Sequence, residues 1–564
     1  MQLITVEKGT ARKAFYSAGL GIAVLAYLTS AQPDPALLIA SLTLSLVGLF
    51  PFYLWATGAS YGLPIWPAFA GYTSVISSMP VLQNARTLEP YSSDAILSGM
   101  AVTGGFLILG TITWATMTAR QPKPPRAVLM LESGSAVKSL FWCLAAGLAF
   151  QANSALDLVT LPGNSMQVMR GICSGLSYLG IFSLAFFAGQ KLLKPGQLLL
   201  YIAMMSGLIL ASITSLMLSG AVPVVALAMV GLVLGSKKVP WLALVVIFPL
   251  VTLLHAGKYQ MREIYYTNDG ERKDRGGVES LPSFYSEWLS FGMQEIGGMA
   301  GIVDLGPKAD SSKSSIFERA GNLHMLLLVM DKTPDQVPFL NGLTYEPIPM
   351  LLIPRFLAPN KGISHAGNLM LSVNYGLVDE DSSRNVSIGW SLPAEAYANF
   401  GYLGVFVLSI LLGVLYAEVT RLSSGVPITS FRFIGGLVVL AGITNENSLG
   451  VFITMQFQGV VGVALASFVL MRRQPNPFAI HTEDGQQEVA WGKRRMPDSA
   501  HTVSGPSTRA PWMPPQMRRR VAAEREQVAA AKLAEEADSG TAKASRPRQV
   551  AVPIQPYYYR SRKA

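Results

Sequence analysis

The chain has 564 residues, of which 50% are hydrophobic and 14% are charged, and its formal net charge is +10. A soluble domain has roughly 25% charged residues, so this composition excludes an ordinary soluble protein. Successive apolar runs of about 17 to 25 residues are long enough to cross the hydrocarbon of a bilayer as helices. The sequence therefore predicts an all-α polytopic membrane protein.

About 12 transmembrane helices are predicted, nine before residue 257 and three after residue 399. Their ranges are 14–31, 36–56, 62–83, 94–117, 138–157, 169–190, 197–217, 218–235, 239–256, 400–419, 430–446 and 449–470. The segment 62–83 differs from the others because three prolines and several hydroxyl residues interrupt its apolar run. Hydropathy alone would leave this segment out.

Lys and Arg cluster in the loops between the predicted helices. The clusters fall at 8–13, 120–138, 191–194, 237–238, 421 and 472–473. Basic loops stay in the cytoplasm, and these clusters share one side only if the segment 62–83 also crosses. The same rule predicts that the N- and C-termini are cytoplasmic and that 257–399 forms a large extracytoplasmic loop between the ninth and tenth spans.

Four regions follow from this layout. They are an N-terminal membrane bundle of about nine spans at 1–256, the extracytoplasmic loop at 257–399, a C-terminal bundle of about three spans at 400–470, and a tail at 471–564. The loop holds 12 Lys and Arg against 17 Asp and Glu, whereas the tail holds 17 against 9. We expect a basic, largely disordered cytoplasmic tail with one helix near 518–537.

The extracytoplasmic loop contains signals for amphipathic helices. A capping box at 315–318 predicts a helix over 316–330. Trp288, Phe291 and Met293 predict a further amphipathic helix lying on the membrane surface. The two cysteines, Cys143 and Cys173, fall within apolar runs, so we expect buried hydrophobic side chains rather than a disulfide framework.

Several common chemistries leave no signature in this sequence. It has neither a P-loop nor a Rossmann glycine fingerprint, and no His, Cys and carboxylate cluster has zinc spacing. Acidic residues are almost absent from the interior of the predicted spans, which disfavours an ion-driven transporter. Cations and hydrogen-bonding groups of the extracytoplasmic loop remain as candidate functional residues.

The candidate cations of this loop are Arg319, His324, Arg355, Lys361, His365 and Arg384. Arg355 and Lys361 lie in 345–361, YEPIPMLLIPRFLAPNK, where prolines restrict the backbone around both. An arginine holds phosphate through two parallel hydrogen bonds and keeps its proton, so these cations suit a phosphate-bearing lipid. The alternative is that each cation contacts lipid headgroups or pairs with a loop carboxylate.

Glu395 lies in 392–404, LPAEAYANFGYLG, just before the tenth predicted span. If this stretch is helical, Glu395 and Asn399 share one face while Tyr397 points elsewhere. A carboxylate at this place could activate a sugar hydroxyl as a general base. A helix cap or a salt bridge to Arg384 is the alternative.

These features together resemble the O-antigen polymerase family, the Wzy-type oligosaccharide repeat unit polymerases. That family combines many spans with one large outer loop late in the chain. Its "PR…P.K" and "E.Y.NFG..G" patterns are matched here by Pro354, Arg355, Pro359 and Lys361, and by Glu395, Tyr397, Asn399, Phe400 and Gly401. The specific part of the resemblance covers about 339–415, and the rest of the chain is similar by span layout.

The resemblance implies a metal-independent glycosyltransferase of the bacterial inner membrane that needs no cofactor. It would join undecaprenyl-diphosphate-linked oligosaccharide repeat units at the outer face, in O-antigen, capsule or exopolysaccharide synthesis. Glu395 and His324 would then be the catalytic candidates. The substrate and its diphosphate would be bound by Arg319, Arg355, Lys361, His365, Arg384, Tyr397 and Asn399.

The expected partners are the lipid-linked oligosaccharide, membrane lipids and a chain-length regulator or another polysaccharide-assembly protein; nucleic acid is not among them. Two other functions stay open. An O-antigen ligase transfers a finished glycan onto the lipid A core and also has a late outer loop. A lipid-linked oligosaccharide flippase or exporter would keep its cations within the bundle.

Overall fold

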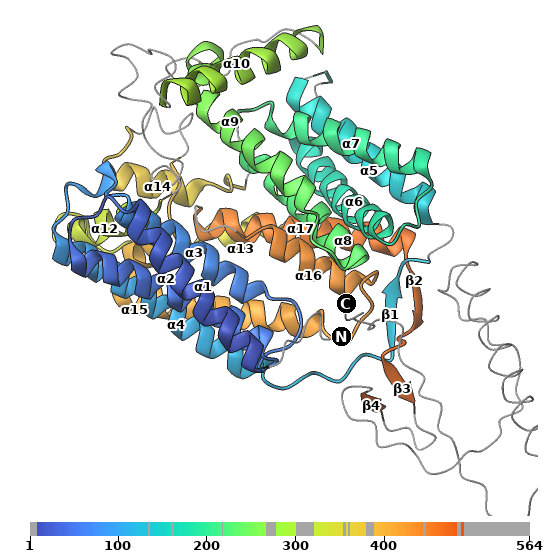
Figure 1. Cartoon of the computed structure of the whole chain (residues 1–564), viewed down its shortest axis with the longest axis horizontal. Coiled ribbons are helices and arrows are strands. Elements are labelled where there is room, and N and C mark those ends of the chain that lie inside the picture. Colours follow the sequence, from blue (N-terminus) through green and yellow to red (C-terminus); the bar gives the residue numbers. More distant parts are fainter. Residues whose placement is uncertain are drawn as a thin grey trace, which may run out of the picture. The chain divides into compact units, whose positions relative to one another are not determined.

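A computed structural model of the chain describes residues 8–132, 136–156, 158–159, 163–216, 218–266, 278–299, 321–353, 357–358, 361–379, 388–443, 447–481 and 487–489. All of them belong to one compact unit that ends at residue 500. This described part is mostly helical, with little sheet (Figure 1). The predicted all-α class is therefore correct at this level.

Each predicted span corresponds to a helix. The nine before residue 257 are α1 (Lys8–Thr29), α2 (Pro35–Ala56), α3 (Ile65–Leu82), α4 (Ser93–Thr118), α5 (Ala136–Leu156), α6 (Gly163–Gly189), α7 (Pro195–Ile213), α8 (Val222–Ser236) and α9 (Trp241–Tyr265). The last three are α15 (Leu392–Leu422), α16 (Phe431–Ala441) and α17 (Leu449–Leu470). Between them lie α10 (Leu281–Met299), α12 (Leu323–Lys332), α13 (Ile348–Leu352) and α14 (Ala366–Asn374).

Eight of these helices are long and apolar enough to cross a membrane, namely α2, α4, α5, α6, α7, α9, α15 and α17. Two more, α8 and α16, are apolar but shorter. This is the pattern of a multi-pass membrane protein. The total of about 12 crossings, and the side on which each terminus lies, stay predictions.

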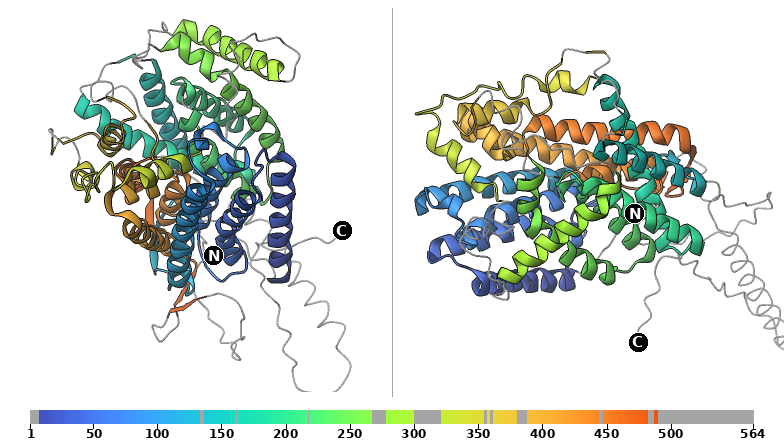
Figure 2. Two further views of the ribbon diagram at one scale, coloured as in Figure 1. Left: turned by 90° about the vertical axis from the view of Figure 1, so that its left-hand side faces the viewer. Right: turned by 90° about the horizontal axis from the view of Figure 1, so that it is seen from above.

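The helices form two groups that α16 and α17 join. One group contains α1 to α4 and α15, and the other contains α5 to α8 (Figures 1 and 2). α17 packs on α6 and on α16, while α16 also contacts α8, α15 and α3. The last two helices thus lie between elements that are far apart in the sequence.

A short antiparallel ribbon joins two loops at one end of the bundle. It pairs β1 (Ala127–Met130) with β2 (Arg472–Pro475). Just beyond it, Asn476 Nδ2 donates to the backbone carbonyls of Pro125 and Gly425, at 2.9 and 2.8 Å. The loop 120–138, the loop after α15 and the start of the tail therefore lie together, as their shared basic charge predicts.

Hydrogen bonds near the two ends of α3 join it to different parts of the bundle. Near its start, the Leu63 carbonyl accepts from Thr420 Oγ1, at 3.0 Å, at the same end as the ribbon. At its other end, the Leu82 carbonyl accepts from the Ala31 amide, at 2.9 Å, between α1 and α2. The prolines of this segment therefore do not stop a helix from forming. α3 is not among the eight helices long and apolar enough to cross a membrane, so its crossing stays a prediction.

Sheet structure is the main feature that was not predicted. Besides the β1–β2 ribbon, β3 (Ala479–His481) pairs with β4 (Gln487–Val489). Residues 472–475, 479–481 and 487–489 of the predicted tail therefore form strands, and most of the remaining tail lies outside the described residues. Strands of three or four residues depend on their pairing partner more than on their own sequence, which is why local patterns missed them. The helix expected near 518–537 lies outside the described residues.

Two expected loop helices differ in detail. Gly321 and Asn322 are not helical, and α12 begins only at Leu323, so the predicted range 316–330 is wrong around Gly321. Glycine costs helix stability and asparagine favours a helix start, which explains the boundary. The capping box at 315–318 lies outside the described residues.

α10 is helical where an amphipathic helix was expected, but its aromatic side faces another helix. Trp288 is completely buried, and its indole N–H donates to the Leu254 carbonyl of α9, at 2.7 Å. Gly257 and Gly292 let the two backbones approach, because a Cβ on Gly257 would lie 2.6 Å from the Gly292 nitrogen. Trp288 therefore serves helix packing rather than contact with a membrane surface.

Candidate functional site

The motif around Glu395 lies at a break in α15. The backbone leaves the helical conformation at Phe400 and Gly401, where Gly401 has φ +62° and ψ −149°. Only glycine adopts this combination readily. A side chain would also lack room, because a Cβ on Gly401 would lie 3.3 Å from the Phe339 ring. The break separates the short first part of α15, residues 392–399, from its long apolar part.

Asn399 fixes the segment at 340–344 to this first part. Its Nδ2 donates to Thr344 Oγ1 and to the Glu395 carbonyl, each at 2.8 Å. Its Oδ1 accepts from the Gly342 amide at 2.9 Å, and two backbone hydrogen bonds join the same segments. Both N–H donors of Asn399 are occupied, so its observed role is to hold the loop in place.

The Glu395 side chain is completely buried and bound to the start of α17. Its Oε2 accepts from the Leu449 amide at 2.5 Å. The positive end of a helix dipole favours such a carboxylate. Glu395 therefore caps α17, while Ser391 caps α15 itself by accepting from the Ala394 amide. The alternative partner, Arg384, lies outside the described residues.

The other carboxylate oxygen of Glu395 has no hydrogen-bond partner among the described residues. It faces Gly367 in α14 and Ser448, the residue before α17. A Cβ placed on Gly367 would lie 3.2 Å from Glu395 Oε1 and 3.3 Å from Ser448 Oγ. Ser448 is also completely buried, and its Oγ likewise lacks a partner in the described part of the chain. Two unpaired buried oxygens thus approach the same point above Gly367.

Asn368 connects α14 with the segments that precede α17 and α15. Its Oδ1 accepts from the Ser448 amide at 2.8 Å, and its Nδ2 donates to the Ile388 carbonyl at 3.1 Å. The Asn368 side chain is itself almost fully buried. One amide side chain thereby joins the start of α14 to the start of α17 and to the segment before α15.

Thr344 and Tyr345 approach Glu395 from the segment between α12 and α13. Thr344 Oγ1 accepts from Asn399 and lies beside the Glu395 carboxylate. The Tyr345 hydroxyl is buried near Glu395 and Asn399. Burial, and then the charge of Glu395, raises the pKa of Tyr345 above its usual value. Tyr345 therefore stays neutral and able to donate at physiological pH.

Lys361 and His365 are two of the predicted loop cations that the structure describes. Lys361 Nζ donates to the carbonyls of Leu351, at 3.0 Å, and Ile353 at the end of α13. A cation at this place satisfies carbonyls that the helix leaves open. His365 directly precedes α14 and is partly buried. The other three cations of the loop, Arg319, Arg355 and Arg384, lie outside the described residues.

Two further candidates, His324 and Tyr397, are described by other contacts. His324 lies in α12, and burial lowers the pKa of His324 below its usual value, although a backbone hydrogen bond at Gly321 opposes this. No hydrogen bond connects His324 with Glu395. The Tyr397 ring packs against Phe339 and Tyr402, with ring centroids 6.5 and 5.1 Å apart. Tyr397 thus points away from Asn399, as a helical face predicts.

Ser448, Gly367, Thr344 and Tyr345 are the neighbours of Glu395 that sequence reasoning did not select. Ser448 carries no charge and directly precedes the last apolar run, so no sequence signal singled it out. Tyr345 lies in the proline-rich stretch but carries no charge. No spacing rule connects α14, α17 and the outer loop, because tertiary packing alone brings them together.

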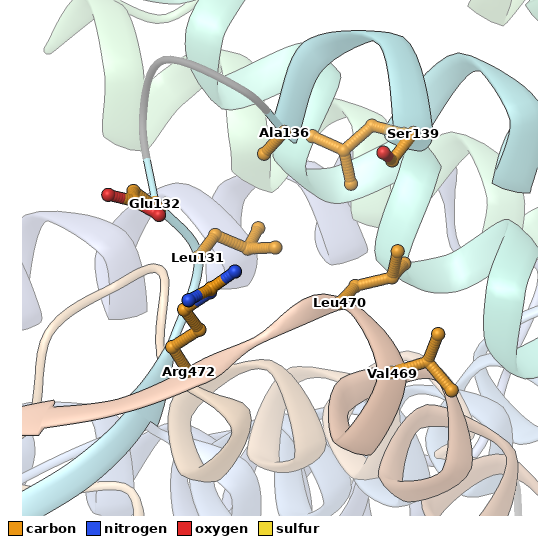
Figure 3. Close-up of a pocket in the computed structure, with 8 residues that line it drawn as sticks. Leu131, Glu132, Ala136, Ser139, Val469, Leu470 and Arg472 are labelled. Atoms are coloured by element: carbon orange, nitrogen blue, oxygen red, sulfur yellow. The ribbon is translucent and has the colours of Figure 1, made fainter.

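A separate pocket lies at the other end of the bundle (Figure 3). Ala136 and Ser139 come from α5, Val469 and Leu470 from α17, and Arg472 from β2. Its remaining lining residues are Leu131, Glu132 and Leu140. Since Leu470 and Leu449 are opposite ends of one helix, this pocket is not part of the Glu395 site.

Comparison of the chain with protein-family profiles, characterised proteins and solved structures finds no match. The functional assignment therefore rests on the residues and contacts described above.

Proposed function

We propose that this protein is a polysaccharide polymerase that joins undecaprenyl-diphosphate-linked repeat units at the outer face of the bacterial inner membrane. One observation carries the proposal. The Glu395 carboxylate is buried, is fixed by the Leu449 amide and keeps one oxygen without a partner among the described residues. A fixed carboxylate with a free oxygen is suited to accept a proton from a substrate hydroxyl.

In this mechanism an acceptor sugar hydroxyl attacks the anomeric carbon at the reducing end of the growing glycan. The new bond joins that oxygen to the anomeric carbon, and its proton passes to Glu395 Oε1. The bond between the anomeric carbon and the diphosphate breaks, and its electron pair leaves with undecaprenyl diphosphate. Arg319, Arg355 and Arg384 are the cations we assign to the charge on that leaving group.

Glu395 is enclosed, so the acceptor reaches it only when the surrounding loop segments separate. The Asn399 hydrogen bonds keep the segment at 342–344 against α15 in the enclosed arrangement. We therefore expect substrate binding to be coupled to a change in this contact.

A flippase is the less favoured alternative, because the buried residues of the described spans include no Lys or Arg. A ligase would use the same carboxylate with a different acceptor. The assay below separates these functions, since a ligase adds glycan to lipid A core and a flippase moves its substrate unchanged.

The test reconstitutes the purified protein in proteoliposomes with a lipid-linked repeat unit and follows chain length. We expect wild type to form polymer, Glu395→Gln to lose about 10²- to 10⁴-fold in rate, and Arg355→Ala to shorten the product. Glu346→Gln, an exposed carboxylate of the same loop, is the matched control and should behave as wild type. A wild-type product that stays a single unit contradicts the proposal, and so does full activity of Glu395→Gln.

A further inference from the structure

We infer that Glu395 Oε1 and Ser448 Oγ form a subsite for one sugar hydroxyl, with Ser448 as the residue that orients the acceptor. This inference rests on the proposed function and adds its hydroxyl-binding residue. Both oxygens belong to completely buried side chains, and neither has a hydrogen-bond partner among the described residues. Both lie within 3.3 Å of the point above Gly367 where a Cβ would be.

The way in which Ser448 begins α17 is unusual for this protein. Serine before the first turn of a helix ordinarily accepts a hydrogen bond from a backbone amide of that turn. The side chains of Ser92, Ser391 and Ser430 do this for α4, α15 and α16. The Ser448 side chain makes no such bond. Its hydroxyl is therefore left for another acceptor, although the residue occupies the position of a cap.

The chemistry of the two oxygens selects a neutral hydroxyl. An ionised carboxylate only accepts hydrogen bonds, whereas a serine hydroxyl can donate one. A bound hydroxyl satisfies both by donating to Glu395 and accepting from Ser448. A phosphate would be repelled by Glu395, whereas a neutral hydroxyl is not. The diphosphate must consequently bind elsewhere, and this subsite takes the acceptor sugar.

The first turn of α17 positions both groups. The Leu449 amide holds Glu395, and the Ser448 amide is held by Asn368. A hydroxyl that accepts from Ser448 directs its proton to Glu395, and its remaining lone pair is free to attack. Ser448 is thus a positioning residue whose loss should affect acceptor use and leave Glu395 in place.

Gly367 provides the space for this hydroxyl. An added methyl group would lie within 3.3 Å of both oxygens, where the bound hydroxyl has to approach. Gly367→Ala should therefore block acceptor binding. Gly104→Ala is the control, because the nearest atom to a Cβ at Gly104 lies at an ordinary 3.9 Å.

The experiment measures polymer formation by the reconstituted full-length protein at varied acceptor concentration, together with the thermal midpoint of each variant. Ser448→Ala should lower kcat/KM for the acceptor about tenfold without lowering the midpoint, because its hydroxyl bonds to no described residue. Ser430→Ala removes a serine that does cap its helix. This variant should lower the thermal midpoint and leave kcat/KM for the acceptor unchanged.

An acceptor analogue without the attacking hydroxyl gives a second measurement. As an inhibitor it should bind wild type more weakly than the intact acceptor does, and Ser448→Ala should remove that difference. Unchanged kcat/KM in Ser448→Ala, while wild type polymerises normally, overturns the subsite and leaves the polymerase function standing. Failure of wild type to polymerise overturns both.

Discussion

Asn399 Nδ2 lies 2.8 Å from Thr344 Oγ1 and thereby ties the last residue before the break in α15 to the loop segment beside Glu395. The contact connects two segments that are 55 residues apart in the sequence. It explains why an asparagine precedes the Phe400–Gly401 break, since no apolar residue could serve Thr344, Gly342 and the Glu395 carbonyl together. Four predictions follow from this contact and others near it.

Replacing Asn399 with alanine should destabilise the protein strongly. Three hydrogen bonds are lost, and Thr344 and Gly342 keep buried polar groups without partners, so we expect a loss of about 2 to 4 kcal/mol. Thermal unfolding in detergent measures this. Asn374→Ala is the control, because the exposed Asn374 donates only to the Met370 carbonyl of its own helix. Equal midpoints for both variants would show that the Asn399 contacts do not hold the loop.

Gly401→Ala should also lower stability, for a different reason. The backbone at φ +62° and ψ −149° disfavours any side chain, at a cost of about 1 to 3 kcal/mol. The comparison is Gly104→Ala in α4, where the helical backbone accepts alanine without strain. We expect the thermal midpoint of Gly401→Ala to lie below that of Gly104→Ala. A Gly401→Ala protein as stable as wild type would mean that α15 can continue through this point unbroken.

Lys361→Met separates the two roles considered for this lysine. If Lys361 mainly caps α13, its loss should cost about 1 to 3 kcal/mol and speed proteolysis within 345–365. Lys238→Met, at an exposed lysine, is the control for the loss of a charge and should keep wild-type stability. A Lys361→Met protein with wild-type stability and protease resistance, but weaker binding of undecaprenyl diphosphate, would instead support the diphosphate role.

His324 should make the protein less stable in mild acid. Its pKa is lowered in the folded state by burial, so the unfolded chain takes up this proton at a higher pH than the folded protein does. Stability is therefore lost as the pH falls through the ordinary histidine value of about 6.5. His324→Gln cannot titrate, so its thermal midpoint should fall less between pH 8 and pH 5.5. An equal fall in both proteins would contradict the burial of His324.

Hydropathy predicted the positions of the spans because a chain in lipid must satisfy its backbone within each segment, which a helix achieves. It did not predict the helix ends. α15 begins at Leu392, because Ser391 caps it and residues 392–399 pack inside the protein. α9 continues to Tyr265, and it packs against α10. Helix ends depend on tertiary partners that have no periodic signal.

The candidate site was predicted only in part. Glu395 was selected because an ionisable residue beside an apolar span is costly to place there and usually has a function. Its partners could not be selected, because a Leu449 backbone amide looks like any other in a sequence. The contact of Lys361 with backbone carbonyls is hidden for the same reason. Charge can be read from the sequence, but the groups that neutralise it are often main-chain atoms.

α17 works as a mechanical link between the two ends of the molecule. Leu449 at its start holds the Glu395 carboxylate, and Leu470 at its end continues directly into the β1–β2 ribbon. The helix is about 33 Å long at 1.5 Å per residue, and it has no proline. A partner that pulls the ribbon along the helix axis would therefore shift the hydrogen-bond donor of Glu395 by a similar distance.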